Sequence, residues 1–199
     1  MHVLKRDGSR EPFDFEKIEK LNEFATKDLN VDVGLLKSQI RFMVFDGMKT
    51  SDIFDAQIKA ASGLITREHP DFTYVAARYL LCDLYKRVNN TAEYHPLRDV
   101  IATGISDGRY SERMSAANFD MDALEAAIDA NRDYQFDYFA LQNIVDRYLM
   151  RRNDGQILEL PQHFFMRVAM GVALNEKNPT AMAIEFYNML SSFDFMSST

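Results

Sequence analysis

The sequence predicts a mainly α-helical protein of class α+β, in which a short β-hairpin precedes a series of amphipathic helices. Apolar residues recur at intervals of three and four along most of the 199 residues, which is the helical period. The chain contains only 5 proline and 8 glycine residues but 11 methionines, a composition that suits packed helices. A hydrophobic fraction of 47% allows one large core or two modest ones.

The hairpin is expected at the start of the chain. Asp7-Gly8 favours a type I′ turn, because both central positions of that turn need positive φ angles. It would join short strands at 3–4 and 11–13. Asp14 stands where the N-cap of a helix belongs. Cations beside a helix N-terminus can hold phosphate, and the alternative is a solvated basic turn. The cations concerned are Lys5, Arg6, Arg10 and Lys17.

Four helices with short connections are predicted after the hairpin, and they suggest a compact bundle. They cover 15 to about 27, 32 to 45, 53 to 64 and 70 to about 88. The triplet Thr50-Ser51-Asp52 is expected to cap the third helix. The polar run Asn89-Asn90-Thr91 indicates a domain boundary, which divides the chain into domains 1–92 and 93–199.

The second domain is predicted to be helical throughout. Its expected helices cover 97–108, 120–130, 137–150, 162–174 and 180–193. Asp154-Gly155 predicts a second short hairpin between 149–150 and 157–158.

Charge and cysteine content exclude several function classes. A net charge of −7 argues against a broad nucleic-acid or anionic-membrane surface. The sequence shows no apolar run of spanning length and no signal peptide, so a cytoplasmic protein is expected. A single cysteine, Cys82, excludes a disulfide framework and a cysteine-rich zinc site. The histidines lack metal-binding spacing, so no metal site is expected. They are His2, His69, His95 and His163.

Three runs of the first domain carry a family resemblance. They are Val3-Leu4-Lys5-Arg6-Asp7-Gly8-Ser9, Lys49-Thr50-Ser51-Asp52-Ile53 and Asp71-Phe72-Thr73-Tyr74-Val75-Ala76-Ala77-Arg78. Together they resemble the ATP-cone, the nucleotide-sensing domain at the N-terminus of many ribonucleotide reductase large subunits. The resemblance implies a four-helix cone capped by a small β-sheet or hairpin.

The second domain resembles the helical segment that precedes the ten-stranded barrel of the same large subunits. The similar runs are Asn131-Arg132-Asp133-Tyr134-Gln135-Phe136-Asp137-Tyr138, Pro161-Gln162-His163-Phe164-Phe165-Met166 and the final nine residues, Ser191 to Thr199. In the family that last run leads into the barrel, so the chain is expected to be either truncated before the catalytic domain or one piece of a split large subunit.

The resemblance implies an allosteric site that binds ATP or dATP together with Mg²⁺. It implies that four cations oppose the phosphates, namely Lys5, Arg6, Lys17 and Lys86. Thr50 would lie beside them, while Glu11 accepts from the base or sugar. Apolar side chains would flank the adenine. The whole implied set is Val3, Lys5, Arg6, Glu11, Asp14, Lys17, Ile18, Thr50, Ile53, Phe54 and Lys86. Thr199 matches a threonine that contacts substrate in the barrel.

Two positions depart from the family pattern. Phe54 stands where well-studied relatives have a histidine close to the ribose, and Cys82 replaces a larger apolar residue near the base. Phenylalanine cannot hydrogen-bond the 2′-hydroxyl, so weaker discrimination between ATP and dATP is one hypothesis. The alternative is that Phe54 only packs the cone.

The implied function is regulation of a class I ribonucleoside-diphosphate reductase, which makes deoxyribonucleoside diphosphates. Bound nucleotide would alter subunit association and the docking of the radical-bearing small subunit. Expected partners are that subunit, other large-subunit chains or the missing catalytic portion. Because reduction needs several cysteines and the chain has only Cys82, these residues alone are expected to be inactive and to hold no redox cofactor. A stand-alone nucleotide sensor and a helical interaction module that binds no nucleotide remain alternatives.

Overall fold

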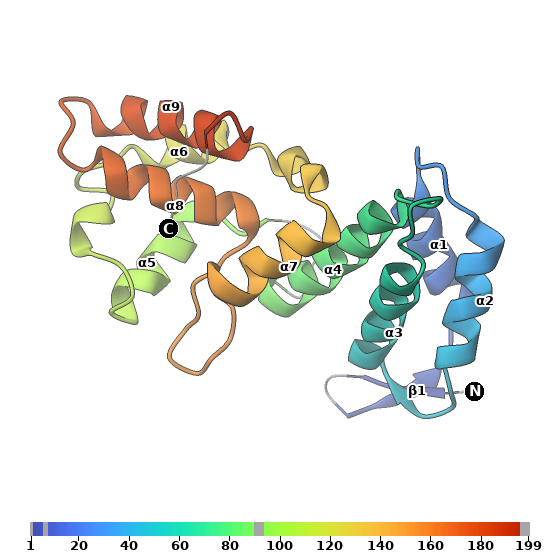
Figure 1. Ribbon diagram of the computed structural model, residues 1–199. Helices are drawn as coiled ribbons and strands as arrows, with labels where there is room; N and C mark the ends of the chain where they lie inside the picture. Colours follow the sequence, from blue (N-terminus) through green and yellow to red (C-terminus); the bar gives the residue numbers. More distant parts are fainter. Residues whose placement is uncertain (1, 6–7, 90–93, 196–199) are drawn as a thin grey trace. The chain divides into compact units, whose positions relative to one another are not determined.

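The computed structural model describes residues 2–5, 8–89 and 94–195, and it confirms a mainly helical protein with a small β-sheet (Figure 1). The chain forms two compact units. The first comprises residues 1–83 and 136–142, and the second comprises 84–135 and 143–199. The predicted boundary after residue 92 falls outside the described residues. Within the described ranges, no helix is both long enough and apolar enough to cross a membrane.

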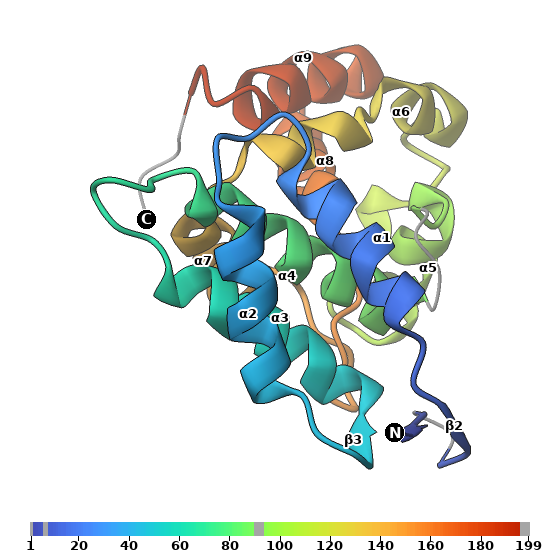
Figure 2. The same ribbon diagram turned by 90° about the vertical axis from the view of Figure 1, so that its right-hand side faces the viewer.

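A three-stranded sheet caps one end of the helices of the first unit (Figure 2). Its strands are β1 (His2–Leu4), β2 (Arg10–Pro12) and β3 (Met48–Lys49), in the order β2-β1-β3. Strand β1 is antiparallel to β2, with Val3 opposite Glu11, and parallel to β3, with Val3 opposite Met48. The hairpin is therefore completed by a third strand that the sequence did not reveal.

The turn between β1 and β2 differs from the predicted two-residue type I′ turn. The Lys5 N–H donates to the Ser9 carbonyl (2.9 Å), and the Gly8 N–H donates to the Lys5 carbonyl (3.0 Å). Three residues therefore connect the paired positions, and Gly8 takes a φ of 84°. A glycine in the left-handed region at the third position is typical of three-residue hairpin loops. Asp7 lies outside the described residues.

The helices of the first unit follow the predicted order. They are α1 (Phe15–Thr26), α2 (Val33–Met43), α3 (Thr50–Gly63) and α4 (Phe72–Asn89), the last of which continues into the second unit. Asp14 caps α1 and Asp32 caps α2 through side-chain oxygens that accept from Glu16 and Leu35 N–H groups, both at 2.9 Å.

The prediction that Thr50-Ser51-Asp52 caps α3 is wrong. Helix α3 begins at Thr50 itself, its N-cap is Lys49, and no side chain supplies a capping hydrogen bond. The reason is that Met48 and Lys49 pair with β1, so the chain passes from strand to helix without an intervening turn.

The core beneath the sheet is apolar. Val3 from β1, Met48 from β3 and Ile53 and Ala56 from α3 are buried together. Partly buried side chains pack against this cluster, namely Phe13, Ile18, Met43 and Val44. Burial of this apolar surface holds the sheet on the helices.

Two polar contacts tie α1 to its neighbours. The buried Asn22 Oδ1 accepts from Gln57 Nε2 of α3 (3.2 Å) and from the Tyr79 hydroxyl of α4 (2.7 Å). Arg78 Nη1 donates to carbonyls at the C-terminal end of α1, of which Lys27 O is nearest at 2.6 Å. The other two carbonyls belong to Phe24 and Ala25.

The second unit is an assembly of short helices. They are α5 (Leu97–Ser106), the 3₁₀ turn η1 (Glu112–Met114), α6 (Met121–Ala127), the 3₁₀ segment η2 (Ala130–Gln135), α8 (Pro161–Ala173) and α9 (Pro179–Ser191). Helix α7 (Tyr138–Arg147) is divided between the two units. Helices α8 and α9 pack along each other (Figure 1).

Two predictions for this unit need correction. The helix expected at 120–130 is two elements, because Ile128 ends α6 in an extended conformation before η2 begins. The hairpin expected at Asp154-Gly155 is reduced to one antiparallel bridge between Arg151 and Ile157. Gly155 again takes a φ of 84°, with the same three-residue loop geometry as the first turn.

Gly104 of α5 permits a close aromatic contact. A Cβ atom at this position would lie 2.0 Å from Cδ2 of Tyr110, so only glycine leaves room for the ring. The Tyr110 hydroxyl donates to Oε2 of the fully buried Glu159 (2.8 Å), and Arg167 Nη2 pairs with Oε1 of the same carboxylate (2.9 Å). Glycine thus positions a buried polar cluster.

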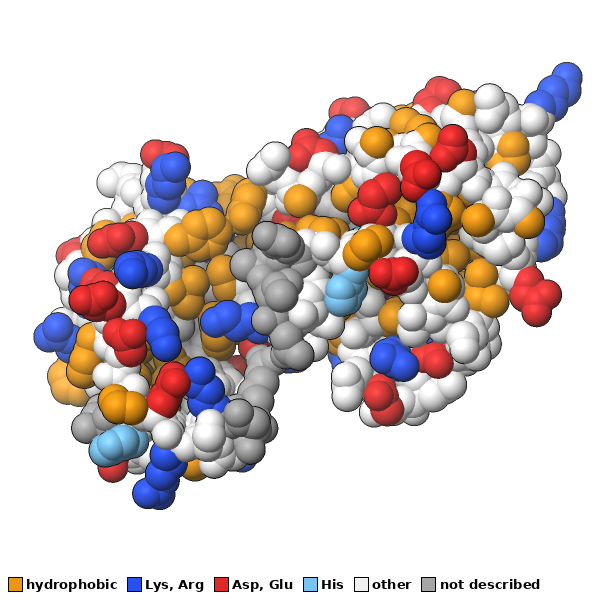
Figure 3. Space-filling model, turned by 180° about the vertical axis from the view of Figure 1, so that it is seen from behind, with side chains coloured by type: hydrophobic (Ala, Val, Ile, Leu, Met, Phe, Trp, Pro, Cys, Tyr) orange, Lys and Arg blue, Asp and Glu red, His pale blue; other side chains and the backbone are white. Residues whose placement is uncertain are grey.

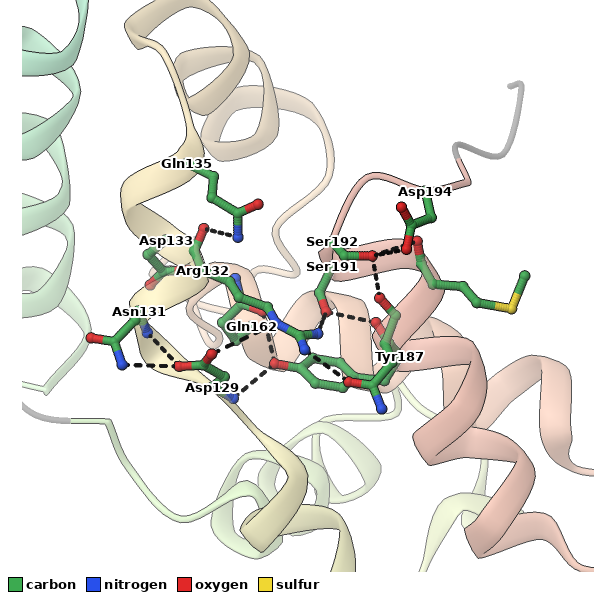
Figure 4. A network of polar contacts seen from close by, with 12 residues as sticks. Asp129, Asn131, Arg132, Asp133, Gln135, Gln162, Tyr187, Ser191, Ser192 and Asp194 are labelled. Carbon is green, nitrogen blue, oxygen red and sulfur yellow. Dashed lines mark hydrogen bonds and ion pairs between the residues drawn. The ribbon is translucent and has the colours of Figure 1, made fainter.

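Asp133 is the centre of a second buried network. Its carboxylate accepts from the hydroxyls of Tyr85 (2.6 Å) and Tyr94 (2.5 Å) and from Gln162 Nε2 (2.8 Å). Gln162 Oε1 in turn accepts from the Tyr187 hydroxyl (2.9 Å), as Figure 4 shows. Burial raises the pKa of Asp133 to about 6, against the opposing effect of these hydrogen bonds.

Candidate functional site

A cluster of four charged side chains lies where the hairpin meets α1. Lys5 Nζ is 3.0 Å from Glu11 Oε2, and Lys17 Nζ is 3.5 Å from Glu11 Oε1 and 3.9 Å from Asp14 Oδ2. Strand β2 and the first turn of α1 position these groups, and all four remain accessible to solvent. The structure therefore brings together four of the predicted site residues.

Glu11 occupies the place between the two ammonium groups. Its hydrogen bond with Lys5 lowers the pKa of its carboxyl, and the charge of Lys17 acts in the same direction. Glu11 therefore stays ionised and pairs with both lysines. An entering phosphate would compete with this carboxylate for the same donors.

A pocket of about 240 Å³, here called the sheet-edge pocket, adjoins the cluster. Its lining residues are Leu4, Lys5, Gly8, Lys49, Thr50 and Ser51. Two lysines and two hydroxyls face a helix start whose N–H groups lack a side-chain cap. Such donors favour an anion. The structure thus places Lys5 and Thr50 on one pocket, and it adds Lys49 and Ser51, which the sequence analysis did not single out.

The apolar members of the predicted site lie in the core. Val3, Ile53 and Phe54 are only 4%, 9% and 7% exposed, and Ile18 is half-buried. Phe54 therefore packs inside the bundle, as the alternative interpretation expects.

The described lining of the sheet-edge pocket does not include three of the predicted residues. Lys86 is exposed on the part of α4 that belongs to the second unit. Arg6 and Thr199 lie outside the described residues. Cys82 is partly buried on α4. Among the residues described, no group of three or more His, Cys, Asp or Glu side chains is arranged to hold a metal ion.

A second pocket of about 390 Å³, here called the interhelix groove, lies between α1 and α2. Its lining residues are Phe13, Phe15, Ile18, Glu19 and Asn22 on the α1 side, with Lys37, Ile40, Arg41 and Val44 on α2. Ile18 is its one member from the predicted site. The apolar periodicity of each helix predicted the apolar residues that line the groove. Only the structure shows that these two helix faces lie against each other.

The charge pattern of the surface is mixed. On the face shown in Figure 3, acidic and basic side chains are interspersed.

Comparison with known protein families gives two matches. Residues 1–87 match the ATP cone domain, and residues 134–199 match the all-alpha domain of ribonucleotide reductase. The sheet-edge pocket and the interhelix groove both lie within the first match.

Several characterised proteins are similar along most of this chain. The ribonucleoside-diphosphate reductase subunit alpha of Helicobacter pylori is 36% identical over 198 residues, which are 99% of this chain and 25% of that protein. The subunit alpha of Chlamydia trachomatis is 40% identical over 84% of this chain and 16% of its own length. Ribonucleoside-diphosphate reductase 1 subunit alpha of Escherichia coli is 32% identical over 96% of this chain and 26% of its own length. The chain thus spans a quarter or less of the first two and about a quarter of the third.

Proposed function

Because this chain belongs to the family of ribonucleoside-diphosphate reductase alpha subunits, we propose that it is the allosteric ATP- and dATP-binding part of such a subunit. Its binding site is the sheet-edge pocket with the adjoining cluster of Lys5, Glu11, Asp14 and Lys17. In the complete cytoplasmic enzyme, the bound nucleotide controls the reduction of ribonucleoside diphosphates through subunit association.

The observation that carries the proposal is that several groups able to bind phosphate converge at the start of α3. Lys5 and Lys49 supply charge, Thr50 supplies a hydroxyl, and the uncapped helix start supplies N–H groups. Hydrogen bonds to charged groups contribute about 1.5–3 kcal/mol each, and several of them are needed for micromolar affinity. Mg²⁺ enters with the phosphate oxygens, since phosphates supply its preferred ligands.

The partners proposed for this part are other large-subunit chains, the catalytic portion and the radical-bearing small subunit. Cys82 cannot supply the several thiols that the reduction needs, so the 199 residues bind effector without turnover. Lys86, Arg6 and Thr199 stay predictions.

Calorimetric titration with ATP and Mg²⁺ tests the proposal. Lys5→Gln and Lys49→Gln each remove one cation from the sheet-edge pocket, and we expect each to weaken binding about tenfold. The control is Lys20→Gln, an equal charge change on the exposed face of α1. If neither ATP nor dATP gives a heat of binding, the helical interaction module is favoured. If all three variants lose the same affinity for ATP, the nucleotide does not bind at the sheet-edge pocket.

The same titration with dATP addresses Phe54. Since this buried side chain offers no hydrogen bond to a 2′-hydroxyl, we expect the dissociation constants of ATP and dATP to differ less than tenfold, or about 1.4 kcal/mol. A larger preference for either nucleotide would contradict this hypothesis.

A further inference from the structure

Asp133, in the second unit, has a buried carboxylate that no cation balances. Its side chain is 0% exposed, and it accepts hydrogen bonds from neutral groups, among them the hydroxyls of Tyr85 and Tyr94. It forms no ion pair within the described part of the chain, and the adjacent Arg132 pairs with Asp129 instead (3.8 Å). Because a buried charge without a counter-charge is costly, this carboxylate gains more from a proton than a solvated one does.

Tyr94 is placed to give that proton away. Its hydroxyl donates to Asp133 Oδ2 (2.5 Å), and its oxygen accepts from the Gln162 N–H at the start of α8 (3.1 Å). The Tyr85 hydroxyl donates to the same Oδ2 atom (2.6 Å), and the rings of Tyr85 and Tyr94 meet edge to face, 5.5 Å apart. Tyr94 is partly exposed whereas Tyr85 is buried, so a solute reaches Tyr94 first.

This arrangement favours loss of an electron from Tyr94. A phenol that loses only an electron becomes a cation, which is costly inside a protein. If the hydroxyl proton moves to Asp133 Oδ2 at the same time, the products are a neutral phenoxyl radical and a neutral carboxylic acid. The step therefore removes the buried charge of Asp133. The Gln162 N–H stays in position to hydrogen-bond the phenoxyl oxygen.

A second tyrosine–carboxylate pair provides a contrast. The Tyr110 hydroxyl donates to Glu159 Oε2 (2.8 Å), but Arg167 also donates to both oxygens of this carboxylate (2.9 Å each). A proton on Glu159 would leave the guanidinium without its counter-charge. Arg167 also lies over the Tyr110 ring, 5.5 Å from its centroid, where a positive charge opposes loss of an electron. Tyr110 is therefore the matched control for Tyr94.

We propose that Tyr94 is a site of reversible one-electron oxidation, with Asp133 as its proton acceptor. The oxidant is a small diffusible radical such as the azidyl radical, which takes the electron and leaves as its anion. A one-electron reductant such as ferrocyanide returns the electron and becomes ferricyanide, while Asp133 returns the proton to the Tyr94 oxygen. The chain has no tryptophan, so tyrosine is its most readily oxidised aromatic residue. The proposal does not rest on the function proposed above.

Such a site would protect the protein from oxidising radicals. The chain has 11 methionines, and an oxidised methionine needs a dedicated reductase to be restored. A tyrosine that is oxidised and reduced without a change of bonded atoms other than one proton needs no repair.

Pulse radiolysis of the full chain in azide solution, followed by electron paramagnetic resonance of freeze-quenched samples, tests the site. We expect a persistent tyrosyl radical in the native protein, which ferrocyanide removes and a second pulse restores. Tyr94→Phe should abolish this persistent signal, and Tyr110→Phe should leave it unchanged. Circular dichroism verifies that each variant is folded.

Asp133→Asn tests the proton acceptor, because it keeps the size of the side chain but removes the base. Electron exchange with a reference phenol in solution measures how readily Tyr94 is oxidised. The variant should shift this equilibrium against the radical at least about tenfold, which corresponds to about 59 mV for one electron.

Acidification tests the same point without a substitution. Burial raises the pKa of Asp133 to about 6, so lowering the pH from about 7.5 to about 5 protonates it. The radical yield of the native protein should then fall to that of Asp133→Asn. The same pH change in Asp133→Asn controls for nearby titratable groups, namely Asp129 and His95, while burial holds the pKa of His163 at about 3.

Three results would each overturn the proposal. The first is a persistent radical in Tyr94→Phe that equals that of the native protein. The second is an oxidation equilibrium that Asp133→Asn leaves unchanged, together with a native yield that does not fall on acidification. The third is loss of the persistent radical in Tyr110→Phe but not in Tyr94→Phe.

Discussion

Two helical glycines should respond oppositely to the same substitution. Gly104 and Gly171 each lie two residues before the end of a helix, α5 and α8 respectively. A Cβ at Gly104 would meet the Tyr110 ring at 2.0 Å, whereas a Cβ at Gly171 meets nothing within 4 Å. Any difference between the two alanine variants therefore reports the ring of Tyr110.

The magnitude for Gly104→Ala follows from three contributions. Overpacking costs about 1–3 kcal/mol. Displacing Tyr110 from the buried Glu159 costs about 1.5–3 kcal/mol more, and the helix propensity of alanine returns about 1 kcal/mol. We expect a net destabilisation of about 1.5–5 kcal/mol. Gly171→Ala, which gains only the propensity term, should stabilise the protein by about 0.5–1 kcal/mol.

Urea denaturation followed by far-ultraviolet circular dichroism measures both variants. The decisive measurement adds Gly104→Ala to a Tyr110→Ala background, in which the ring is absent. There the same substitution should become neutral or stabilising, because contacting residues are energetically coupled. The packing argument is refuted if Gly104→Ala is as harmful in that background as in the native protein. It is also refuted if Gly104→Ala in the native protein is as benign as Gly171→Ala.

Two other predictions concern buried polar contacts. The pKa of Asp133 is raised to about 6, so the native state keeps its proton to a higher pH than the unfolded state does. The contribution of Asp133 to stability is therefore greatest below about pH 4 and is lost as the pH rises to about 6. The urea midpoint of the native protein should fall across this range, and that of Asp133→Asn should lack this fall. Parallel pH dependences of the two midpoints would contradict the prediction. Arg78→Gln removes the donor to three carbonyls at the end of α1 and should cost about 1.5–3 kcal/mol. In Arg78→Gln, amide hydrogen exchange should become faster in the last turn of α1. The control Arg67→Gln, at an exposed position, should leave it unchanged, and equal exchange in the two variants would count against the contact.

Local sequence signals predicted the helices well. Apolar periodicity and a polar N-cap are encoded within a few residues, which is why α1 and α2 begin directly after Asp14 and Asp32, as expected. Features that depend on distant pairing were missed. Strand β3 has two residues and exists only through β1, and this pairing makes Lys49 the N-cap of α3.

The candidate site divides in the same way. Lys5, Glu11 and Lys17 are close in sequence and were identified through the resemblance, and the structure places them in contact. Asn22 could not be identified from its position in α1. Its buried contacts are with Gln57 and Tyr79, which come from other helices and donate to its Oδ1.

The pairing of Glu11 with two lysines has a consequence for how fast a polyanion can arrive. Lys5, Lys17, Glu11 and Asp14 sum to zero formal charge, so together they exert little long-range attraction. Raising the ionic strength should therefore leave the association rate of a nucleotide almost unchanged. Glu11→Gln would expose the two ammonium groups, accelerate capture and make it sensitive to salt.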